Sequence, residues 1–170
     1  MRLRTRIGAL LTALVVGAGG ALVAATPAHA GTYRYLIKLE GTSYCLALPG
    51  YPYNAGAQLQ LDNCAFAPSF TFVDTGYADF EYWLRVDYTG YYVQGGAPEL
   101  LNSTLIQWPF CSCGDQIWHL VAASNGAILI QNPAHHWWIM QAEPYLYAYV
   151  RYAYIDTNPN AWKRWVLIPV

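Results

Sequence analysis

The chain has 170 residues, of which 55% are hydrophobic, 16% aromatic and only 11% charged, and its formal net charge is −1. A chain of this length forms one domain with a sizeable core. The lack of a basic excess argues against nucleic acid and anionic lipid as partners, because both are bound by clusters of lysine and arginine.

The first 30 residues have the pattern of a secretory signal peptide. Three arginines occur within the first six residues, a small and apolar stretch runs from Ile7 to Thr26, and Ala28-His29-Ala30 is an A-x-A cleavage site. A membrane anchor is the alternative, but anchors need about 20 strongly apolar residues, and this stretch is mostly alanine, glycine and valine. We expect cleavage before Gly31, a secreted chain of residues 31–170 and no membrane insertion after cleavage.

Four cysteines follow, at positions 45, 64, 111 and 113, and an even number in an exported chain favours disulfides. Three pairings are possible. A bond between Cys45 and Cys64 would close a hairpin-sized loop and contribute about 3 kcal/mol. Cys111 and Cys113 would then form a tight ring or remain as two free, partly buried thiols. Because a C-x-C pair lacks two of the four ligands of a zinc site, we expect no metal.

The remaining chain predicts strands and no helices, since short β-branched and aromatic runs alternate with turn residues. The predicted strands cover residues 35–39, 58–61, 82–86, 104–108, 128–130 and 147–155. Predicted turns lie at 49–50, 54–56, 89–90, 95–96, 125–126 and 158–159. Closely spaced strands without helices indicate a sandwich or a barrel.

Three sets of apolar residues recur with the same spacing of 46 or 47 residues. They are Ile37, Leu84 and Ile130; Cys45, Tyr92 and Trp138; and Phe72, Trp118 and Trp165. A period of this size indicates repeated copies of one supersecondary unit. The copies would cover roughly Tyr33–Asp74, Tyr82–Val121 and Asn125–Ile168, each with about four strands.

Three such copies around a pseudo-threefold axis predict an all-β β-trefoil over residues 31–170. A three-bladed propeller is the alternative, although propellers usually have about four or more blades. In the trefoil, Phe72, Trp118 and Trp165 would fill the inner layer of the core, next to Ile37, Leu84 and Ile130.

Each copy also carries degenerate motifs of the approximate form G-x-C-L-D, Q-L-W-x-C and Q-x-W. The motifs are Gly41, Cys45-Leu46, Gln60–Cys64 and Phe70–Phe72 in the first copy; Gly90–Val93, Gln107–Cys111 and Gln116–Trp118 in the second; and Trp138-Ile139, Ala153–Thr157 and Lys163–Trp165 in the third. In this register the chain resembles the ricin-type lectin repeat, which also serves as a carbohydrate-binding module. The resemblance implies a β-trefoil that binds extracellular carbohydrate.

The resemblance also implies where sugar would bind. In that family an aspartate two residues after the first cysteine position accepts hydrogen bonds from sugar hydroxyls, and an aromatic residue two positions before the second cysteine stacks on the ring. The aspartate positions hold Ala47, Gln94 and Met140, and the aromatic positions hold Asp62, Pro109 and Ile155. No copy keeps either residue in this register.

The second copy offers the best substitute site, formed by Gln94, Asn102, Gln107 and Trp108. A one-residue slip would place Trp108 or Tyr154 at the aromatic position and let Gln94 or Gln141 replace the aspartate, although such a slip turns side chains to the other face of a strand. Further stacking platforms could form from aromatic residues in two other regions. These are Tyr51 and Tyr53, and Trp137, Tyr145, Tyr147 and Tyr149.

No residue pattern indicates catalysis. The nucleophile-elbow motif G-x-S-x-G is absent from the sequence. Asp74, Asp79 and Glu81 could be a glycosidase carboxylate pair, but their place between two copies favours a solvated turn. We therefore expect a non-catalytic module without cofactor that binds an extracellular glycan or polysaccharide. The alternative is a protein-binding trefoil that has lost sugar binding, such as a secreted inhibitor or a component of an envelope or toxin assembly. Its partner would then be a secreted or envelope protein.

Overall fold

The structure is a computed structural model that describes residues 33–50, 52–96, 102–135, 138–153 and 161–170. The predicted signal peptide lies outside the described residues. The strands are β1 (Tyr33–Leu39), β2 (Tyr44–Ala47), β3 (Gln60–Asn63), β4 (Phe70–Asp74), β5 (Glu81–Val86), β6 (Tyr92–Gly95), β7 (Leu105–Trp108), β8 (Ile117–Ala122), β9 (Ile128–Asn132), β10 (Trp138–Gln141), β11 (Arg151–Ala153) and β12 (Trp165–Pro169), with 3₁₀ turns η1 (Gly114–Gln116), η2 (Ser124–Gly126) and η3 (Ala161–Lys163). Within these ranges, no helix is long and apolar enough to cross a membrane.

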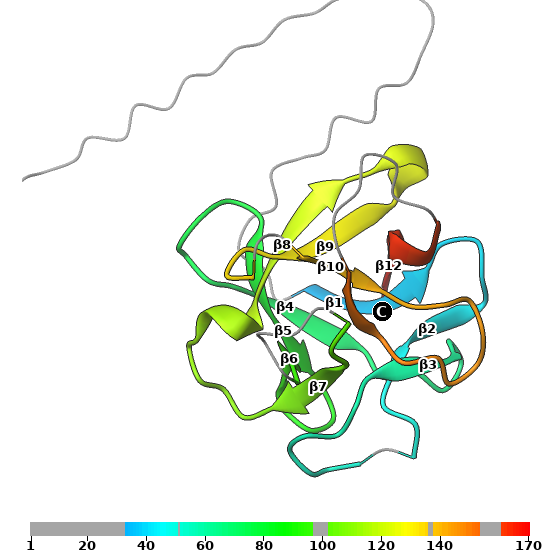
Figure 1. Ribbon diagram of the computed structural model, residues 1–170, viewed down its shortest axis with the longest axis horizontal. Helices are drawn as coiled ribbons and strands as arrows, with labels where there is room; N and C mark the ends of the chain where they lie inside the picture. The colour runs from blue at the N-terminus through cyan, green and yellow to red at the C-terminus, as the bar shows by residue number, and fades with distance from the viewer. Residues whose placement is uncertain (1–32, 51, 97–101, 136–137, 154–160) are drawn as a thin grey trace, which may run out of the picture.

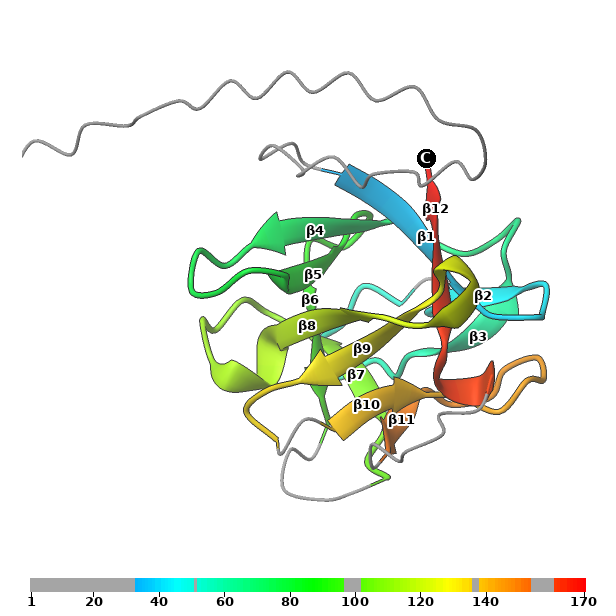
Figure 2. The same ribbon diagram turned by 90° about the horizontal axis from the view of Figure 1, so that it is seen from above.

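Six of the strands close into a barrel. The antiparallel ladders run from β1 to β4, β5, β8, β9 and β12, and β12 pairs with β1 again along five residue pairs. The last strand therefore lies beside the first (Figures 1 and 2). Closure leaves the barrel without a free edge, which removes the risk of pairing with another chain.

The other six strands form three hairpins, β2–β3, β6–β7 and β10–β11. The hairpins meet through a closed ring of backbone hydrogen bonds. Leu59 N–H donates to Leu105 O at 2.8 Å, Leu105 N–H donates to Val150 O at 2.8 Å, and Val150 N–H donates to Leu59 O at 3.0 Å. All three residues are fully buried, so these bonds satisfy backbone groups that water cannot reach.

The predicted inner layer of the core is confirmed. Ile37, Leu84 and Ile130 are fully buried, as are Trp118 and Trp165. Phe72 is also buried, and its ring makes an edge contact with Tyr35 at a centroid distance of 5.3 Å. Each of the two tryptophans fills the core with a large ring and satisfies its indole N–H with a backbone carbonyl.

The expected Cys45–Cys64 disulfide is present, and of the two possibilities left open for Cys111 and Cys113 the structure has the disulfide. Cys45 is bonded to Cys64 across the β2–β3 hairpin with a Cα–Cα distance of 4.8 Å, and Cys111 is bonded to Cys113 in the loop after β7. The alternative of two free thiols at Cys111 and Cys113 is therefore wrong for this structure.

Two local predictions are wrong. The strand expected from Tyr147 begins only at Arg151, because Tyr147 has a φ of 63° and belongs to a turn. The turn expected at Gly95 is part of strand β6. A Cβ at Gly95 would lie 2.4 Å from a ring carbon of Tyr152, so the glycine admits this ring and does not mark a turn.

A half-buried carboxylate links residues of β1, β4 and the segment before β4. Asp87, directly after β5, accepts hydrogen bonds from Arg34 Nε at 2.8 Å, Ser69 Oγ at 2.6 Å and Thr71 Oγ1 at 2.5 Å. Burial alone would raise the pKa of Asp87, but the hydrogen bonds from Ser69, Thr71 and Arg34 and the charge of Arg34 outweigh it and lower this pKa. The charged form of Asp87 therefore stabilises the fold.

Replacing Trp118 by alanine should lower the free energy of unfolding by about 3–5 kcal/mol, because the change leaves a cavity at a fully buried site and an unpaired carbonyl on Val93. Urea denaturation followed by circular dichroism measures the loss. The control is Trp162→Ala, at an exposed position. Equal losses in both variants would contradict the packing described here.

Replacing Asp87 by asparagine should cost about 1.5–3 kcal/mol at neutral pH, the usual contribution of hydrogen bonds to a charged group. Because the folded pKa is lowered, this stabilisation is present above the ordinary value of 3.8 and is lost as the pH falls below it. Unfolding free energies of the two proteins should therefore converge in acid. Asp79→Asn, at an exposed carboxyl in the β4–β5 turn, is the control; a gap at Asp87 that does not depend on pH would refute the assignment.

Candidate functional site

The four residues predicted to form the site are not brought together. Gln107 is fully buried, and its carboxamide is bonded within the chain on both sides. Its Nε2 donates to Pro52 O at 2.7 Å and to Asn54 O at 3.0 Å, and its Oε1 accepts from Thr89 at 2.9 Å. Gln107 holds the loop at residues 52–54 and has no free group for a ligand.

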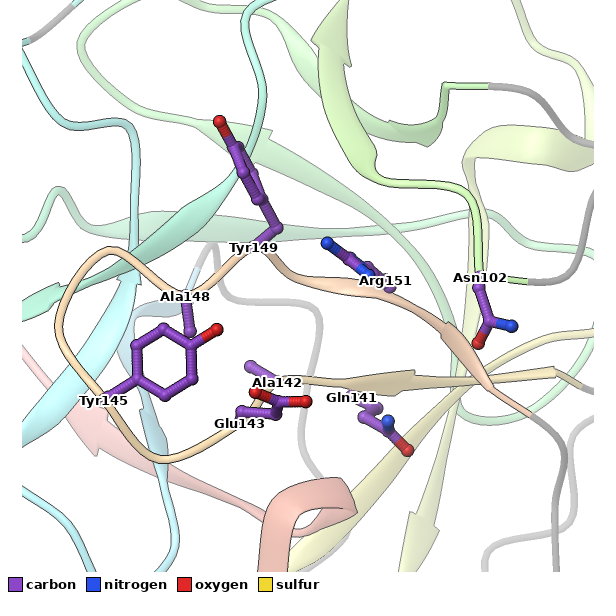
Figure 3. A pocket seen from close by; sticks show the side chains of 8 residues that line it. All are labelled: Asn102, Gln141, Ala142, Glu143, Tyr145, Ala148, Tyr149 and Arg151. Atoms are coloured by element: carbon purple, nitrogen blue, oxygen red, sulfur yellow. The ribbon is translucent and has the colours of Figure 1, made fainter.

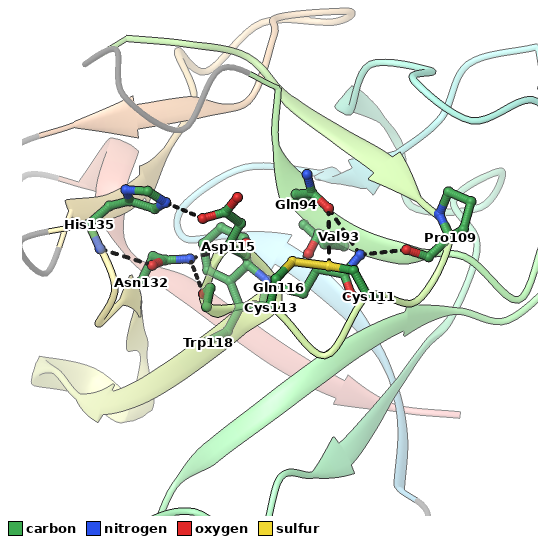
Figure 4. The surroundings of a disulfide bond; sticks show 11 residues. Val93, Gln94, Pro109, Cys111, Cys113, Asp115, Gln116, Trp118, Asn132 and His135 are labelled. Atoms are coloured by element: carbon green, nitrogen blue, oxygen red, sulfur yellow. Dashed lines mark hydrogen bonds and ion pairs between the residues drawn. A yellow bond between two sulfur atoms is a disulfide. The ribbon is translucent and has the colours of Figure 1, made fainter.

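Gln94 and Trp108 do share one face of the β6–β7 hairpin. Gln94 pairs with Ile106 and Trp108 pairs with Tyr92, so all four side chains lie on the same side of the ladder. Trp108 is 41% exposed. Gln94 Oε1 accepts a hydrogen bond from Gln116 Nε2 at 3.0 Å (Figure 4). The hairpin therefore presents one oriented amide and one exposed indole ring.

Hydrogen bonds from two tryptophans show which residues of the predicted second and third copies are equivalent. Trp118 Nε1 donates to Val93 O, and Trp165 Nε1 donates to Met140 O, in both cases 25 positions back. The residue equivalent to Gln94 is therefore Gln141, one position after the residue that the sequence motif indicated. Met140 instead lies in the core.

The ring of hydrogen bonds between the hairpins shows in the same way which residues of the first and second copies are equivalent. Leu59 corresponds to Leu105, so Asp62 corresponds to Trp108 and not to the predicted Pro109. The second hairpin therefore has an aromatic residue, Trp108, at the position where the resemblance places the stacking ring. The one-residue shift of the motif register that the sequence offered as a possibility agrees with the positions of Trp108 and Gln141 in the structure. Tyr154 lies outside the described residues.

A concave site lies beside the third hairpin, with a cavity volume of about 370 Å³. It is lined by Asn102, Gln141, Ala142, Glu143, Tyr145, Ala148, Tyr149 and Arg151 (Figure 3). Figure 3 shows Tyr145 at one end and Asn102 at the other, with Gln141 and Arg151 between them. Two amides, one carboxylate, one guanidinium and two tyrosines therefore converge on one hollow.

Backbone pairing sets the direction of these side chains. Val150 is fully buried in the core, so its neighbours Tyr149 and Arg151 in the extended chain point outward. Gln141 lies directly opposite Arg151 in the β10–β11 ladder, on the same face. Asn102 closes the pocket from the preceding segment, where its N–H donates to Tyr152 O at 3.1 Å. Its φ of 66° is a conformation that asparagine adopts more readily than most residues.

The two charged residues of the pocket, Arg151 and Glu143, each lie beside a tyrosine. The Arg151 guanidinium carbon lies 5.8 Å from the centre of the Tyr149 ring, a cation–π distance. A hydrogen bond to Glu143, together with the negative charge of that carboxylate, raises the pKa of Tyr145. The Tyr145 ring is 55% exposed and therefore within reach of a ligand.

Glu143 and Arg151 were not singled out in the sequence. The sequence does carry a signal for Arg151, because it alternates with Tyr149 on either side of the apolar Val150, the pattern of an extended segment with one outward face. Among the other predicted platforms, Tyr53 is exposed in its loop. Tyr51 and Trp137 lie outside the described residues.

The acidic residues between the first two predicted copies lie at the β4–β5 turn. Asp74 and Asp79 are exposed, and Asp74 Oδ1 accepts a hydrogen bond from Gly76 N–H at 2.8 Å, which stabilises the turn. In the described part of the chain, no three histidine, cysteine, aspartate or glutamate side chains gather in a way that could hold a metal ion.

Replacing Gln107 by alanine should destabilise the protein by about 1–3 kcal/mol, because it leaves two carbonyls of the 52–54 loop without a partner. Thermal unfolding measures this effect, with Gln58→Ala at an exposed position as the control. A variant that keeps its stability and loses only ligand affinity would assign Gln107 to the site instead.

No protein-family model and no curated protein matches the sequence. Solved structures nevertheless resemble this chain. The designed threefold-symmetric protein ThreeFoil is 15% identical, with 81% of this chain and 99% of ThreeFoil covered and a TM-score of 0.73. The Rhizoctonia solani agglutinin is 17% identical over 85% of this chain and 100% of its own, with a TM-score of 0.71.

A third structure is the Polyporus squamosus lectin bound to a sialylated epitope, Neu5Acα2-6Galβ1-4GlcNAc. It is 17% identical, with 82% of this chain covered and a TM-score of 0.68. This chain spans only 50% of that lectin's length. At these levels of identity the likeness concerns the fold, and with the closed barrel and its three hairpins it establishes that this chain is a β-trefoil.

Proposed function

We propose that this protein is an exported, non-catalytic β-trefoil module that binds carbohydrate in the pocket beside the third hairpin. The observation that carries the proposal is the convergence of Asn102, Gln141 and two tyrosines on one hollow. Amides donate and accept hydrogen bonds at once, as sugar hydroxyls do. Exposed tyrosine rings offer the apolar face and polar tip that suit a sugar ring.

We further propose that the trefoil consists of three repeats of roughly 46 residues. Three groups of four strands support this, since β1–β4, β5–β8 and β9–β12 follow one another at this period. The two indole hydrogen bonds over 25 positions support it as well. A module of this kind can carry one site per repeat, and here the polar residues differ between repeats.

The relatives in fold favour a carbohydrate ligand over other classes. One is an agglutinin, and another is a lectin with a sialylated oligosaccharide bound. Export is supported by the signal-peptide pattern of residues 1–30 and by the two disulfides.

A glycan array probed with the purified chain should give binding to a defined group of glycans. Gln141→Ala and Tyr149→Ala should each weaken that binding about tenfold, since the loss of one hydrogen bond or ring contact of about 1.4 kcal/mol has this effect. Titration calorimetry with the best glycan measures the change. Tyr53→Ala, an exposed tyrosine outside the pocket, is the matched control and should bind as the unmodified chain does.

Two other outcomes would contradict a carbohydrate site in this pocket. Binding that survives in both pocket variants but fails in Trp108→Ala would move the site to the β6–β7 hairpin. A blank across diverse glycans would reject carbohydrate binding altogether.

The second candidate is a protein-binding trefoil, and one surface favours it. Four aromatic rings follow one another in contact across the β4–β5 turn, β5, β6 and the loop after β7. Tyr77 lies 6.0 Å from Trp83, Trp83 lies 5.1 Å from Phe110, and Phe110 lies 5.0 Å from Tyr92, measured between ring centres. Tyr77 and Phe110 are exposed, and contiguous exposed rings are typical of protein interfaces. Under this alternative, Phe110→Ala abolishes partner binding and the pocket variants do not.

A further inference from the structure

The two disulfides have different surroundings. Cys45 is fully buried in β2, and its bond to Cys64 spans 19 positions. Cys111 is exposed, and its bond to Cys113 spans two positions in the loop between β7 and η1. A thiolate can attack a disulfide only where it reaches a sulfur. Cys64 and Cys113 are both half-buried, so the exposed Cys111 makes the Cys111–Cys113 bond the more accessible of the two.

We propose that Cys111–Cys113 is a reversible thiol–disulfide exchange site that accepts two electrons from an external dithiol. This proposal is independent of carbohydrate binding. The partner class is a small dithiol or the paired cysteines of a thiol–disulfide oxidoreductase. Attack falls on Cys111, because its residue is exposed whereas Cys113 is half-buried.

The exchange has two balanced steps. A thiolate of the dithiol attacks Cys111 Sγ and forms a mixed disulfide, while the bond to Cys113 breaks and Cys113 leaves as a thiolate that takes a proton from water. The second thiolate of the reductant then attacks the reductant's first sulfur in the mixed disulfide. The bond from that sulfur to Cys111 Sγ breaks, and Cys111 leaves as a thiolate and is protonated in turn. The chain gains two electrons and two protons, and the dithiol becomes a disulfide.

The length of each loop favours selective reduction. Loop-closure entropy stabilises a disulfide more when the closed loop is longer. The bond between neighbouring positions 111 and 113 restricts the unfolded chain little, whereas the Cys45–Cys64 bond restricts a whole hairpin. Opening the short ring therefore leaves most of the fold's stability in place.

Buried Gln116 holds the ring from the inside through bonds that do not involve sulfur. Its Oε1 accepts from Cys111 N–H at 3.0 Å, and its own N–H donates to Cys113 O at 3.1 Å. Its Nε2 donates to Pro109 O at 2.8 Å (Figure 4). These bonds persist when the disulfide opens, so the two thiols remain close enough to pair again.

The end of β9 and the turn that follows it hold the same loop from the other side. Asn132 Nδ2 donates to Gly114 O at 3.3 Å and to Asp115 O at 3.2 Å, and His135 Nε2 contacts Asp115 Oδ1 at 2.5 Å. Figure 4 shows these contacts flanking the disulfide. With both sides fixed, the backbone at Cys113 cannot move far from Cys111.

An acceptor for the reduced form is also in place. Gln94 Oε1 lies 3.8 Å from Cys111 Sγ. Once the bond opens, the Cys111 thiol can donate its proton toward this oxygen, a contact with no counterpart in the disulfide form. Gln94, bonded to Gln116, is already oriented for that role.

The test is selective reduction of the folded chain. The purified protein is treated with increasing dithiothreitol, alkylated with iodoacetamide and mapped by peptide mass spectrometry. Cys111 and Cys113 should both become alkylated at about a tenth or less of the dithiothreitol needed for Cys45 and Cys64. Near-ultraviolet circular dichroism recorded on the same samples should stay that of the folded protein, and removal of the reductant before alkylation should restore the monomeric disulfide.

Two variants sharpen the result. Cys113→Ser leaves only Cys111 of the pair, and Cys111→Ser leaves only Cys113; the first should react about tenfold faster with an aromatic disulfide reagent. The double variant Cys111→Ser/Cys113→Ser should take up no alkyl group at the concentration that modifies the unmodified chain.

Three results overturn the proposal. They are reduction of Cys45–Cys64 at the same or lower concentration, resistance of Cys111–Cys113 until the chain unfolds, and reoxidation to disulfide-linked dimers instead of the internal bond.

Discussion

A ring of three backbone hydrogen bonds is the constraint on which the structure depends. Leu59, Leu105 and Val150 each donate to the next, and all three are fully buried. A buried backbone group without a partner costs about 1–3 kcal/mol. All three segments must therefore be in place for every hydrogen bond of the ring to form. They are 46 and 45 residues apart, and this near-equality keeps the three hairpins in one layer above the barrel.

The ring also decides what each hairpin presents to solvent. In a strand, successive side chains point to opposite faces, so an inward Val150 makes Tyr149 and Arg151 face outward into the pocket. On the second hairpin, inward Leu105 and Gln107 leave Ile106 and Trp108 on the outer face. The pocket and the exposed indole are thus consequences of how the core closes.

Two buried glutamines that lie in lectin-like motifs of the sequence stabilise loops of the fold. Gln107 secures the 52–54 loop, and Gln116 secures the loop that carries Cys111 and Cys113. Both belong to motifs by which the sequence resembles the ricin-type lectin repeat. In this chain an amide in a lectin-like motif can serve the fold, whereas Gln141 and Asn102, outside the second copy's motif, line the pocket.

The sequence alone was enough to predict most of the strands, the core and the Cys45–Cys64 disulfide, but it left Cys111 and Cys113 open between a bond and two free thiols. Large apolar side chains must be buried, and their spacing of 46 or 47 residues left one arrangement for Ile37, Trp118 and Trp165. Polar side chains carry no such requirement. Gln107 and Trp108 are neighbours in the chain, yet one is buried and the other exposed, because hydrogen bonding between distant strands sets the face of each. Only the tertiary structure could bring Asn102 to Gln141 and Arg151, since backbone bonds between separate hairpins, which no local pattern encodes, decide which polar groups meet.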